Sequence, residues 1–287
     1  MKSAGTAVIA IILGLISVTV GLIWPRLQTD PPASQVYDYT PGPLGMRLIA
    51  HAGGGLPYGI YSNSIKATEL AVDNAFDLIE IDFSLTTDGQ LVAIHDWEDS
   101  YRYWFDLPFI DQFKVLIGQP PTVPDHATFM AMSMQYGQEQ ADLAAIMAWL
   151  AAHPDVRIVT DVKGDNLEAL TLIAETYPTL LPQIVPQIYA PEEYAPVVNL
   201  GWTDIIFTIY RSQLTPEEIA TFASSVPLYA LTVPYRVIIN DRYATLLDLP
   251  VPVFVHTINT PRFATELQGI GVAGLYTDYL IPAVNTD

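Results

Sequence analysis

Short apolar segments alternate with helix-like segments along this chain from residue 46 onward. Most of the apolar segments are nearly continuous in Val, Ile, Leu and Phe, which is typical of parallel strands covered on both faces. We expect strands at 46–51, 77–85, 90–96, 156–163, 182–189, 203–210, 227–233, 252–258 and 272–278. Helices are expected at 63–75, 139–152, 165–176, 191–199, 215–224, 236–247 and 260–269. Because eight strand–helix units fit a chain of this length, the pattern favours an α/β fold of the (β/α)8 TIM-barrel type over an open doubly wound sheet.

One region, at about 97–138, interrupts the alternation. The strand at 90–96 is expected to pair with the strand before it, and the residues that follow are aromatic, Met-rich and interrupted by Pro. We interpret them as an insertion at the C-terminal end of a strand, within a barrel domain that spans 46–287. Aromatic packing under a long loop is the simplest explanation of its composition, and a lid or lipid-facing surface is the alternative.

The N-terminal segment has a different character, because no charged residue occurs between Lys2 and Arg26. Its apolar part, 7–24, is long enough to cross a bilayer as a transmembrane helix and longer than the apolar region of most signal peptides. We therefore predict a membrane anchor or signal segment at 1–25, with an uncleaved anchor preferred. A Pro- and Gly-rich linker follows at 26–45. The basic start predicts an extracytoplasmic catalytic domain, periplasmic or extracellular; secretion after cleavage is the alternative.

The overall charge of the chain restricts its partners. It has 12 Lys and Arg against 31 Asp and Glu, a formal net charge of −19. Nucleic acid is excluded as a partner, because its phosphates require a positive surface. An anionic small molecule can still bind where a cation or a few basic side chains reverse the field locally. Because the chain has no cysteine, disulfides, thiolate catalysis and cysteine-ligated zinc are excluded as well.

Carboxylates and a lysine stand at the ends of two expected strands, where barrel active sites collect. Glu80 and Asp82 are two residues apart, so both point to one face of their strand, and Asp161 and Lys163 share a face of the next in the same way. Solvated surface pairs are the alternative for each set. Together, three carboxylates suit a hard divalent cation, Mg²⁺ or Ca²⁺, and a cation beside a lysine suits a phosphate.

Two histidines end neighbouring expected strands. His51 closes the first strand, and His95 is followed directly by Asp96 at the end of the third. Taken singly, a histidine here is explained by a hydrogen-bonded strand end, and Asp96 by a turn or a helix cap. Beside a cation site, two histidines suit proton transfer to and from ester oxygens.

Six segments resemble, in order and spacing, the motifs of the glycerophosphodiester phosphodiesterase family, within the phosphatidylinositol-phospholipase-C-like barrel superfamily. "IAHAGG" is similar to the family's His-Arg-Gly strand. "SNSIKATELAVDNAFDLIEIDFSLTTDGQLVAIHD" is similar to its Glu-Asn-Thr helix, Glu-x-Asp strand, T-x-DG turn and His-Asp pair. "VTDVK", "VFVHTIN" and "GVAGLYTD" are similar to its Glu-x-Lys strand, its Trp-Thr-Val-Asn strand and its closing motif. The resemblance covers essentially all of 46–280.

The resemblance implies roles for six residues: acid–base catalysis by His51 and His95, binding of a divalent cation by Glu80, Asp82 and Asp161, and contact with phosphate by Lys163. It also implies a TIM barrel and phosphoric diester hydrolase activity. The glycines that follow His51 are expected to let substrate approach the backbone closely.

The chain departs from the family at several positions. Ala52 stands where the family has an arginine that contacts phosphate, and alanine cannot replace that bidentate side chain. Arg211 or Arg102 are candidate replacements. Asp161 replaces a glutamate, and His256 replaces a tryptophan near the end of its strand; with Lys163 and Arg211 we count His256 among the substrate-binding candidates.

We therefore predict a metal-dependent phosphodiesterase that hydrolyses glycerophosphodiesters or lysophospholipid-like diesters. Its partners would be a small-molecule phosphodiester or lysophospholipid and, through the N-terminal segment, the membrane. An aspartate as third ligand and a residue other than arginine after the first histidine also resemble sphingomyelinase-D-like phospholipases. Two alternatives stay open: a phospholipase-D/C-like lyase that releases a cyclic phosphate, and a catalytically weak barrel that binds a phosphorylated ligand.

Overall fold

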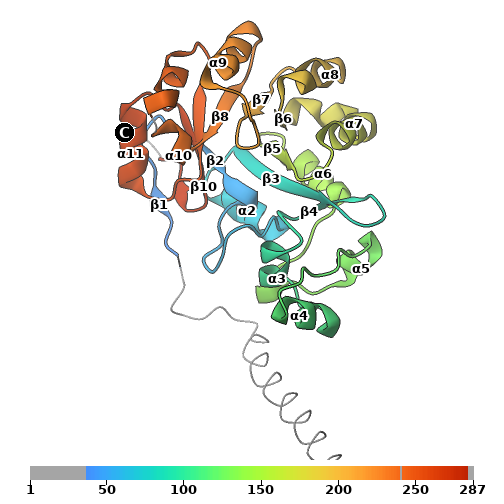
Figure 1. Ribbon diagram of the computed structural model, residues 1–287. Coiled ribbons are helices and arrows are strands. Elements are labelled where there is room, and N and C mark those ends of the chain that lie inside the picture. The colour runs from blue at the N-terminus through green and yellow to red at the C-terminus, as the bar shows by residue number, and fades with distance from the viewer. Residues whose placement is uncertain (1–36, 240, 284–287) are drawn as a thin grey trace, which may run out of the picture.

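A closed barrel of eight parallel strands forms the centre of the molecule, with helices around it (Figure 1). The computed structural model describes residues 37–239 and 241–283. The barrel strands are β2 (Arg47–Ala50), β3 (Leu78–Leu85), β5 (Arg157–Val162), β6 (Ile184–Ile188), β7 (Ile206–Thr208), β8 (Ala230–Pro234), β9 (Val253–His256) and β10 (Gly274–Thr277). Strand β2 pairs with both β10 and β3, which closes the sheet. The predicted (β/α)8 barrel is therefore confirmed.

Helices follow the strands as the alternation predicts. They are α2 (Ile65–Asp73), α6 (Leu143–Ala152), α7 (Asn166–Thr176), α8 (Tyr194–Asn199), α9 (Pro216–Ser225), α10 (Tyr235–Ile238) and α11 (Pro261–Gly269). Short 3-10 turns are η3 (His51–Gly53), η4 (Gln135–Gly137), η5 (Pro178–Gln183), η6 (Pro191–Glu193) and η7 (Asp241–Asp248). The single helix predicted at 236–247 is wrong, because α10 and η7 replace it. Its "VIIND" run combines β-branched residues with Asn and Asp, which are weak helix formers.

The hairpin strand β4 (Leu91–Ala93) runs antiparallel to β3, so the predicted pairing is confirmed. After it come α3 (Asp99–Trp104), α4 (Phe109–Leu116) and α5 (His126–Ala131), which lie beside the barrel (Figure 1). They share a second hydrophobic core that includes Tyr101, Trp104, Phe105 and Phe129. Aromatic packing under the inserted segment is confirmed for these four residues, whereas the aromatic rings of α4 are exposed.

The barrel interior is filled by one side chain from each strand. This layer consists of Ile49, Leu78, Val159, Val185, Ile206, Ala230, Phe254 and Tyr276. Because side chains alternate along a strand, the residue two positions later on each strand faces the same interior, one layer closer to the C-terminal mouth. A larger core lies between the outward-facing strand residues and the helices.

The N-terminal part of the described chain lies against the barrel. Within the predicted linker, β1 (Thr40–Pro41) pairs with β11 (Leu280–Ile281), and Tyr37 stacks on Tyr279 with ring centroids 4.6 Å apart. The predicted anchor or signal segment at 1–25 lies outside the described residues. Across residues 37–239 and 241–283, no helix is long and apolar enough to cross a membrane.

Candidate active site

A polar layer lies on the apolar interior layer, at the mouth of the barrel. It contains the residue two positions after each interior residue: His51, Glu80, Asp161, Gln187, Thr208, Thr232, His256 and Asp278. All of them are buried except His256, which is partly buried. Eight polar side chains in a mostly enclosed layer are costly to bury unless they bind one another or a ligand. This layer is therefore the candidate active site.

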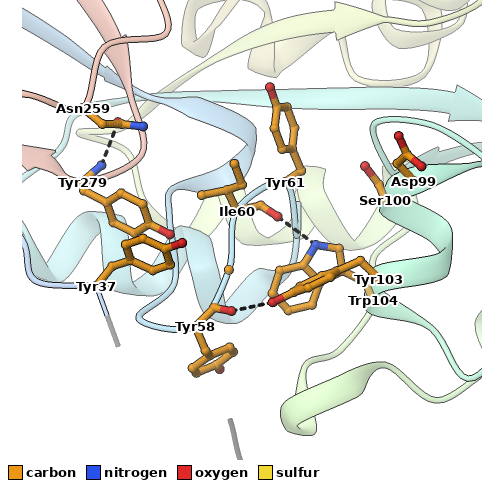
Figure 2. A pocket seen from close by; sticks show the side chains of 11 residues that line it. Tyr37, Tyr58, Ile60, Tyr61, Asp99, Ser100, Tyr103, Trp104, Asn259 and Tyr279 are labelled. Carbon is orange, nitrogen blue, oxygen red and sulfur yellow. Dashed lines mark hydrogen bonds between the residues drawn. The ribbon is translucent and has the colours of Figure 1, made fainter. Parts of the chain in front are cut away.

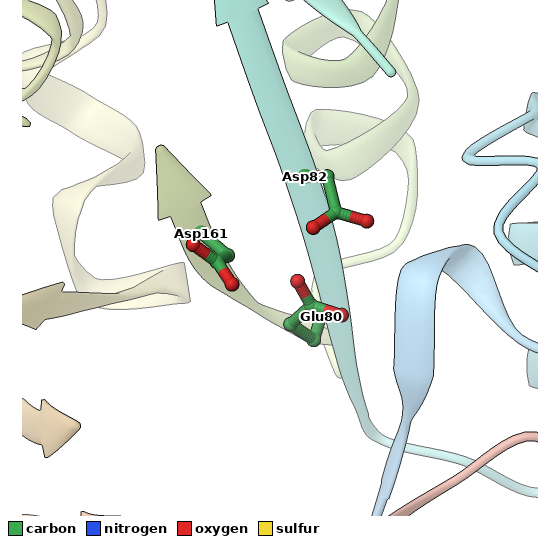
Figure 3. Close-up of side chains that lie close together, drawn as sticks. All are labelled: Glu80, Asp82 and Asp161. Atoms are coloured by element: carbon green, nitrogen blue, oxygen red, sulfur yellow. The ribbon is translucent and has the colours of Figure 1, made fainter. Parts of the chain in front are cut away.

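Three carboxylates meet in this layer because of the register between β3 and β5. Asp82 is the direct Cα partner of Asp161, and Glu80 lies two residues earlier on the same face of β3. One oxygen from each of the three carboxylates lies within 4.8 Å of the others (Figure 3). The structure thus brings together the three residues that the sequence predicts as cation ligands.

Backbone and amide groups hold two of these carboxylates in place. The Ala52 N–H donates to Glu80 Oε2 at 2.6 Å. Asn63 brackets Asp82: its Nδ2 donates to Asp82 Oδ2, and its Oδ1 accepts from the Asp82 N–H, both at 2.9 Å. Glu80 Oε1 is buried and accepts no hydrogen bond from the described residues, whereas the buried Asp82 Oδ1 pairs with the Lys163 ammonium.

The Lys163 ammonium partly neutralises the cluster. Its Nζ lies 2.8 Å from Asp82 Oδ1 and 2.9 Å from Asp161 Oδ2. Burial would lower the pKa of Lys163, but the charges of Asp82 and Asp161 raise it, so the lysine stays protonated. The pKa of Glu80 is raised well above its usual value by burial and by the negative charge of Asp82. One lysine therefore does not satisfy three buried carboxylates.

This donor set fits a hard divalent cation. Such ions prefer oxygen ligands, and the cluster offers oxygens from three carboxylates, of which Glu80 Oε1 is buried without a hydrogen-bond donor among the described residues. A cation there would relieve the repulsion between Glu80 and Asp82. Glu80, Asp82 and Asp161 are the residues that would hold it.

Two tyrosines and an arginine surround Asp161. Its Oδ1 accepts hydrogen bonds from the Tyr189 hydroxyl at 2.5 Å and from the Tyr210 hydroxyl at 2.9 Å. The Arg211 guanidinium lies over both rings, 4.2 Å from the Tyr189 centroid and 5.1 Å from that of Tyr210. Its Nη2 is 3.8 Å from Asp161 Oδ1. Arg211 therefore lies at the site, whereas Arg102, the other candidate, is exposed on α3 and pairs with Asp99.

His51 is positioned by Asp278, a carboxylate close to the C-terminal end of the sequence. His51 Nδ1 lies 2.9 Å from Asp278 Oδ1, and Asn259 Nδ2 donates to Asp278 Oδ2 at 2.6 Å. Burial alone would lower the pKa of His51, but the charge and hydrogen bond of Asp278 raise it to about 9. His51 is therefore protonated at neutral pH, and its Nε2 is left to act in the site.

His95 has an equivalent arrangement. Its Nδ1 lies 2.7 Å from Asp96 Oδ2, and Asp96 also accepts from the Ser100 hydroxyl and from the Glu98 and Ser100 backbone. Asp96 thus both orients the histidine and forms the turn before α3. Burial would raise the pKa of Asp96, but its four donors lower it, which keeps it ionised. A carboxylate that accepts from Nδ1 fixes the tautomer whose Nε2 is free to accept a proton.

Tyr61 lies between the two histidines. Its ring centroid is 4.8 Å from that of His51 and 4.6 Å from that of His95, with both contacts edge to face. His51 and His95, which are 44 positions apart in sequence, therefore flank a single aromatic ring at the barrel mouth.

His256 lies in the polar layer at the end of β9. Its Nε2 is buried without a hydrogen-bond partner among the described residues. Burial and the nearby charge of His51 lower the pKa of His256 to about 4, so the ring is neutral. A neutral, unpaired ring nitrogen fits contact with a ligand better than binding of a proton.

A cleft of about 520 Å³ is lined in part by Tyr61, the ring that contacts both histidines. Figure 2 shows Tyr37 and Tyr279 on one side of it, Tyr103 and Trp104 of α3 on the other, and Tyr61 between them. Because the rings line its walls, the cleft suits a group with apolar or cationic surface.

Sequence reasoning missed the groups that hold the histidine and the carboxylates. Asp278, Asn259 and Asn63 received no role, although each occurs in a quoted motif. The glycines after His51 also have a role in packing, and the expectation that they admit substrate stays a prediction. A Cβ on Gly55 would lie 2.4 Å from the Asp278 carbonyl oxygen, and Gly53 and Gly54 also pack against protein atoms. These glycines let this turn approach neighbouring parts of the chain closely.

The sequence around β3 and the start of the inserted segment matches a family model. The model, described as the glycerophosphoryl diester phosphodiesterase family, covers residues 51–114, a span that includes His51, Glu80, Asp82 and His95. The match confirms the predicted family resemblance. This phosphodiesterase family consists of hydrolases, so the prediction of a phosphoric diester hydrolase is confirmed at that level. No curated protein matches the chain.

Solved structures of phosphodiesterases share the fold. A glycerophosphodiester phosphodiesterase from Parabacteroides distasonis is 18% identical with a TM-score of 0.61, over 83% of this chain and 94% of that one. The enzyme from Thermotoga maritima is 16% identical with a TM-score of 0.60, over 82% and 95%. A phosphodiesterase from Oleispira antarctica, solved with the product sn-glycerol-3-phosphate, is 15% identical with a TM-score of 0.56, over 81% and 93%. At these identities the likeness establishes the barrel fold.

Proposed function

We propose that this chain is a metal-dependent phosphodiesterase that hydrolyses glycerophosphodiesters or lysophospholipid-like diesters. One observation carries the proposal. Two histidines, each with Nδ1 bound to its own carboxylate, lie at the barrel mouth that also holds three clustered carboxylates and a lysine. A barrel that only binds a phosphorylated ligand has no need of two oriented proton-transfer groups.

The carboxylate cluster would hold Mg²⁺ or Ca²⁺. A bound cation would supply positive charge to the nonbridging phosphate oxygens, where negative charge builds up during displacement at phosphorus. Lys163, which already bonds two of the carboxylates, would add a second positive charge beside the phosphate.

The two histidines would divide the proton transfers. His51 is the general acid, because the pKa of about 9 keeps a proton on it at neutral pH. It would give that proton to the leaving oxygen as the P–O bond breaks and its electron pair goes to that oxygen. His95 Nε2 would accept the proton of the attacking hydroxyl while the oxygen of that hydroxyl forms the new P–O bond.

Arg211 would replace the arginine that the family carries at the position of Ala52. Its guanidinium is stacked on two tyrosines near Asp161, so it is held at the mouth without being fully paired. The cleft of Figure 2 would take the alcohol on the other side of the phosphate. The product bound to the Oleispira antarctica relative supports a glycerol phosphate ester as the substrate class.

We also propose that residues 1–25 anchor this barrel to a membrane with the site on the extracytoplasmic side; release by signal cleavage is the alternative. The support is the uncharged apolar run at 7–24 and the basic residue before it. Labelling of intact cells with a membrane-impermeant reagent, on a cysteine introduced at an exposed barrel position, would test the orientation.

Hydrolysis assays test the activity directly. The full chain is incubated with a panel of glycerophosphodiesters and lysophospholipids in Mg²⁺ or Ca²⁺, and then in EDTA. We expect turnover that EDTA abolishes and that His51→Ala and His95→Ala each lower by at least two orders of magnitude. The matched control, His153→Ala just after α6, removes a histidine away from the mouth and should leave turnover unchanged.

The products separate the alternatives. ³¹P NMR distinguishes a phosphomonoester, which supports hydrolysis, from a cyclic phosphate, which would show the lyase reaction instead. Binding of glycerol phosphate without turnover of any substrate would contradict the enzyme proposal and favour the binding barrel. Full activity in the double histidine variant would overturn the acid–base assignment.

A further inference from the structure

Helix α4 has its apolar side chains outside and its polar side chains inside. Phe109 is 73% exposed and Leu116 66%, and the other large apolar residues of the segment, Ile110, Phe113 and Ile117, are each at least half exposed. Asp111 in the same helix is only 4% exposed. A helix at the surface of a soluble protein normally shows the reverse pattern.

The inward polar contacts fix this orientation. Asp111 Oδ1 accepts hydrogen bonds from the Thr122 N–H at 2.9 Å and from its hydroxyl at 2.7 Å, and Lys114 Nζ pairs with the same oxygen at 3.1 Å. Gln112 Nε2 donates to the Leu107 carbonyl at 2.7 Å. These bonds tie the polar side of the helix to the residues just before and after it, so the apolar side faces outward.

The exposed apolar residues are concentrated in this one segment. Thirteen large hydrophobic residues are exposed in the described part of the chain, and five of them fall within 109–117. Single exposed apolar side chains need no explanation, whereas a contiguous group marks a surface that is covered in the working protein.

The position at which the described chain begins indicates what covers it. Tyr37 lines the same cleft as Tyr103 and Trp104 of α3, and α3 leads into α4 within five residues (Figure 1). Only residues 25–36 separate Tyr37 from the uncharged apolar segment at 7–24. A chain of that length spans at most about 40 Å. A bilayer reached by that segment would therefore lie within reach of the face that carries α4.

We propose that the apolar face of α4, residues 109–117, inserts into the interface of a bilayer with zwitterionic headgroups. Apolar side chains on one side of a helix, with polar groups opposite, suit a helix lying in the plane of an interface. The net charge of −19 opposes adsorption to an anionic bilayer, so the proposal is limited to neutral lipid surfaces. The docked helix would hold the aromatic cleft next to the lipid. This surface is independent of the proposed chemistry and rests on the proposed anchor.

Labelling at a single cysteine tests the proposal, because the chain has no cysteine of its own. Phe113→Cys and Ile270→Cys, which are 50% and 52% exposed in the parent, are each labelled with an environment-sensitive fluorophore. Ile270 is the matched control because it follows the last residue of α11, at the end of the barrel opposite to the C-terminal ends of the strands. The full chains are reconstituted into phosphatidylcholine vesicles with and without phosphatidylcholine that carries a spin-label quencher near the headgroup. Unchanged melting temperatures would show that neither label disturbs the fold.

We expect blue-shifted emission and at least twofold quenching by the spin-labelled lipid at position 113, and neither at position 270. Blue-shifted emission without lipid quenching would mean that protein covers the helix, either a second copy or residues 1–36, and would overturn the proposal. A solvent-like signal at 113, equal quenching at both positions, or failure of the chain to float with the vesicles would overturn it too. The measurement reports the position of the label relative to the bilayer rather than turnover, so its result does not depend on whether the proposed activity is correct.

Discussion

Single side chains at the barrel mouth acquire their properties from charges that lie far away in the sequence. His51 and Asp278 are 227 positions apart, yet they are 2.9 Å apart in the fold, and Asp278 raises the pKa of the histidine. The same holds for Lys163, whose charge is maintained by Asp82 on the neighbouring strand. At this scale the chemistry belongs to pairs of residues rather than to the individual histidine or lysine.

Replacement of Asp278 by Asn should change the pH dependence of turnover. The pKa of His51 is raised to about 9, so its acid form is present below that pH and is lost as the pH rises through it. Asp278→Asn keeps the shape but removes the charge, so the pKa falls and the alkaline decline in kcat moves to lower pH. We expect a loss of roughly tenfold near pH 8 and a smaller loss near pH 6. An alkaline limb that stays in place, as expected for the exposed control Asp155→Asn, would refute the assignment of His51 as the acid.

Replacement of Lys163 by Met should make folding depend on an added cation. The change removes the ammonium that pairs directly with Asp82 and Asp161, and loss of one partner from such a buried group costs about 3 kcal/mol. We expect a lower free energy of unfolding in EDTA and a larger stabilisation by Mg²⁺ or Ca²⁺ than in the parent. Chemical denaturation with and without the cation measures both effects. Lys66→Met, at an exposed position on α2, should change neither; an equal response to cation in parent and Lys163→Met would count against the cation site.

Elements position these residues through register and close backbone contact. The direct pairing of Asp82 with Asp161 follows from the alignment of β3 and β5, and two acids at alternate positions could be placed on one face from the sequence. The contact between the glycine turn after β2 and the loop after β10 follows from no local pattern. In that contact the Gly55 N–H donates to the Asp278 carbonyl at 3.1 Å, which places Asp278 beside His51.

Gly55→Ala should damage this contact. The added Cβ would lie 2.4 Å from the Asp278 carbonyl oxygen, so the two loops must separate. We expect a loss of about 2 kcal/mol in the free energy of unfolding, as for overpacking of a tight site, together with reduced turnover. Gly269→Ala at the end of α11 is the matched control, because no heavy atom lies within 4 Å of its added Cβ. Equal stability of the two variants, measured by thermal melting, would show that the turn tolerates separation.

Sequence patterns predict where the strands lie better than they predict which side of a helix faces solvent. Each of the nine expected strands is found, because parallel strands buried on both faces are continuous in apolar residues. The carboxylate cluster follows from alternation within strands, and its predicted cation-binding role stays a prediction. The outward orientation of α4 could not be predicted, because it depends on hydrogen bonds between Asp111 and Thr122 across a loop. The position of Tyr61 between two histidines likewise depends on the closed barrel.

The whole molecule is strongly acidic around a site that must receive a phosphate. With a net charge of −19, its long-range field repels anions, and the positive groups Lys163, Arg211 and protonated His51 oppose that field at the mouth. An anionic substrate would therefore be attracted by the mouth only at short range and repelled by the net charge of the protein at long range.

Salt should accordingly speed the capture of anionic substrates. Raising NaCl from about 10 to about 150 mM shortens the screening length from about 30 to about 8 Å, so repulsion at a distance falls more than attraction in the site. We expect kcat/KM to rise about twofold or more for glycerophosphoglycerol, which is anionic, and to change little for zwitterionic glycerophosphocholine. Initial rates at low substrate measure both. A fall for the anionic ester would mean that local attraction dominates.

The antiparallel strand β4 lies between the main hydrophobic core and the second core formed by the inserted segment. Leu91 and Ala93 pack into the main core, whereas Val92 packs with the inserted aromatic residues in the second core. His95 follows this strand, whereas His51 follows the barrel strand β2. The proposed acid thus follows a strand of the barrel, and the proposed base follows a strand whose side chains pack in both hydrophobic cores. Because the loop that carries His95 packs through the second core, substitutions in that core would bear on the position of His95 relative to His51.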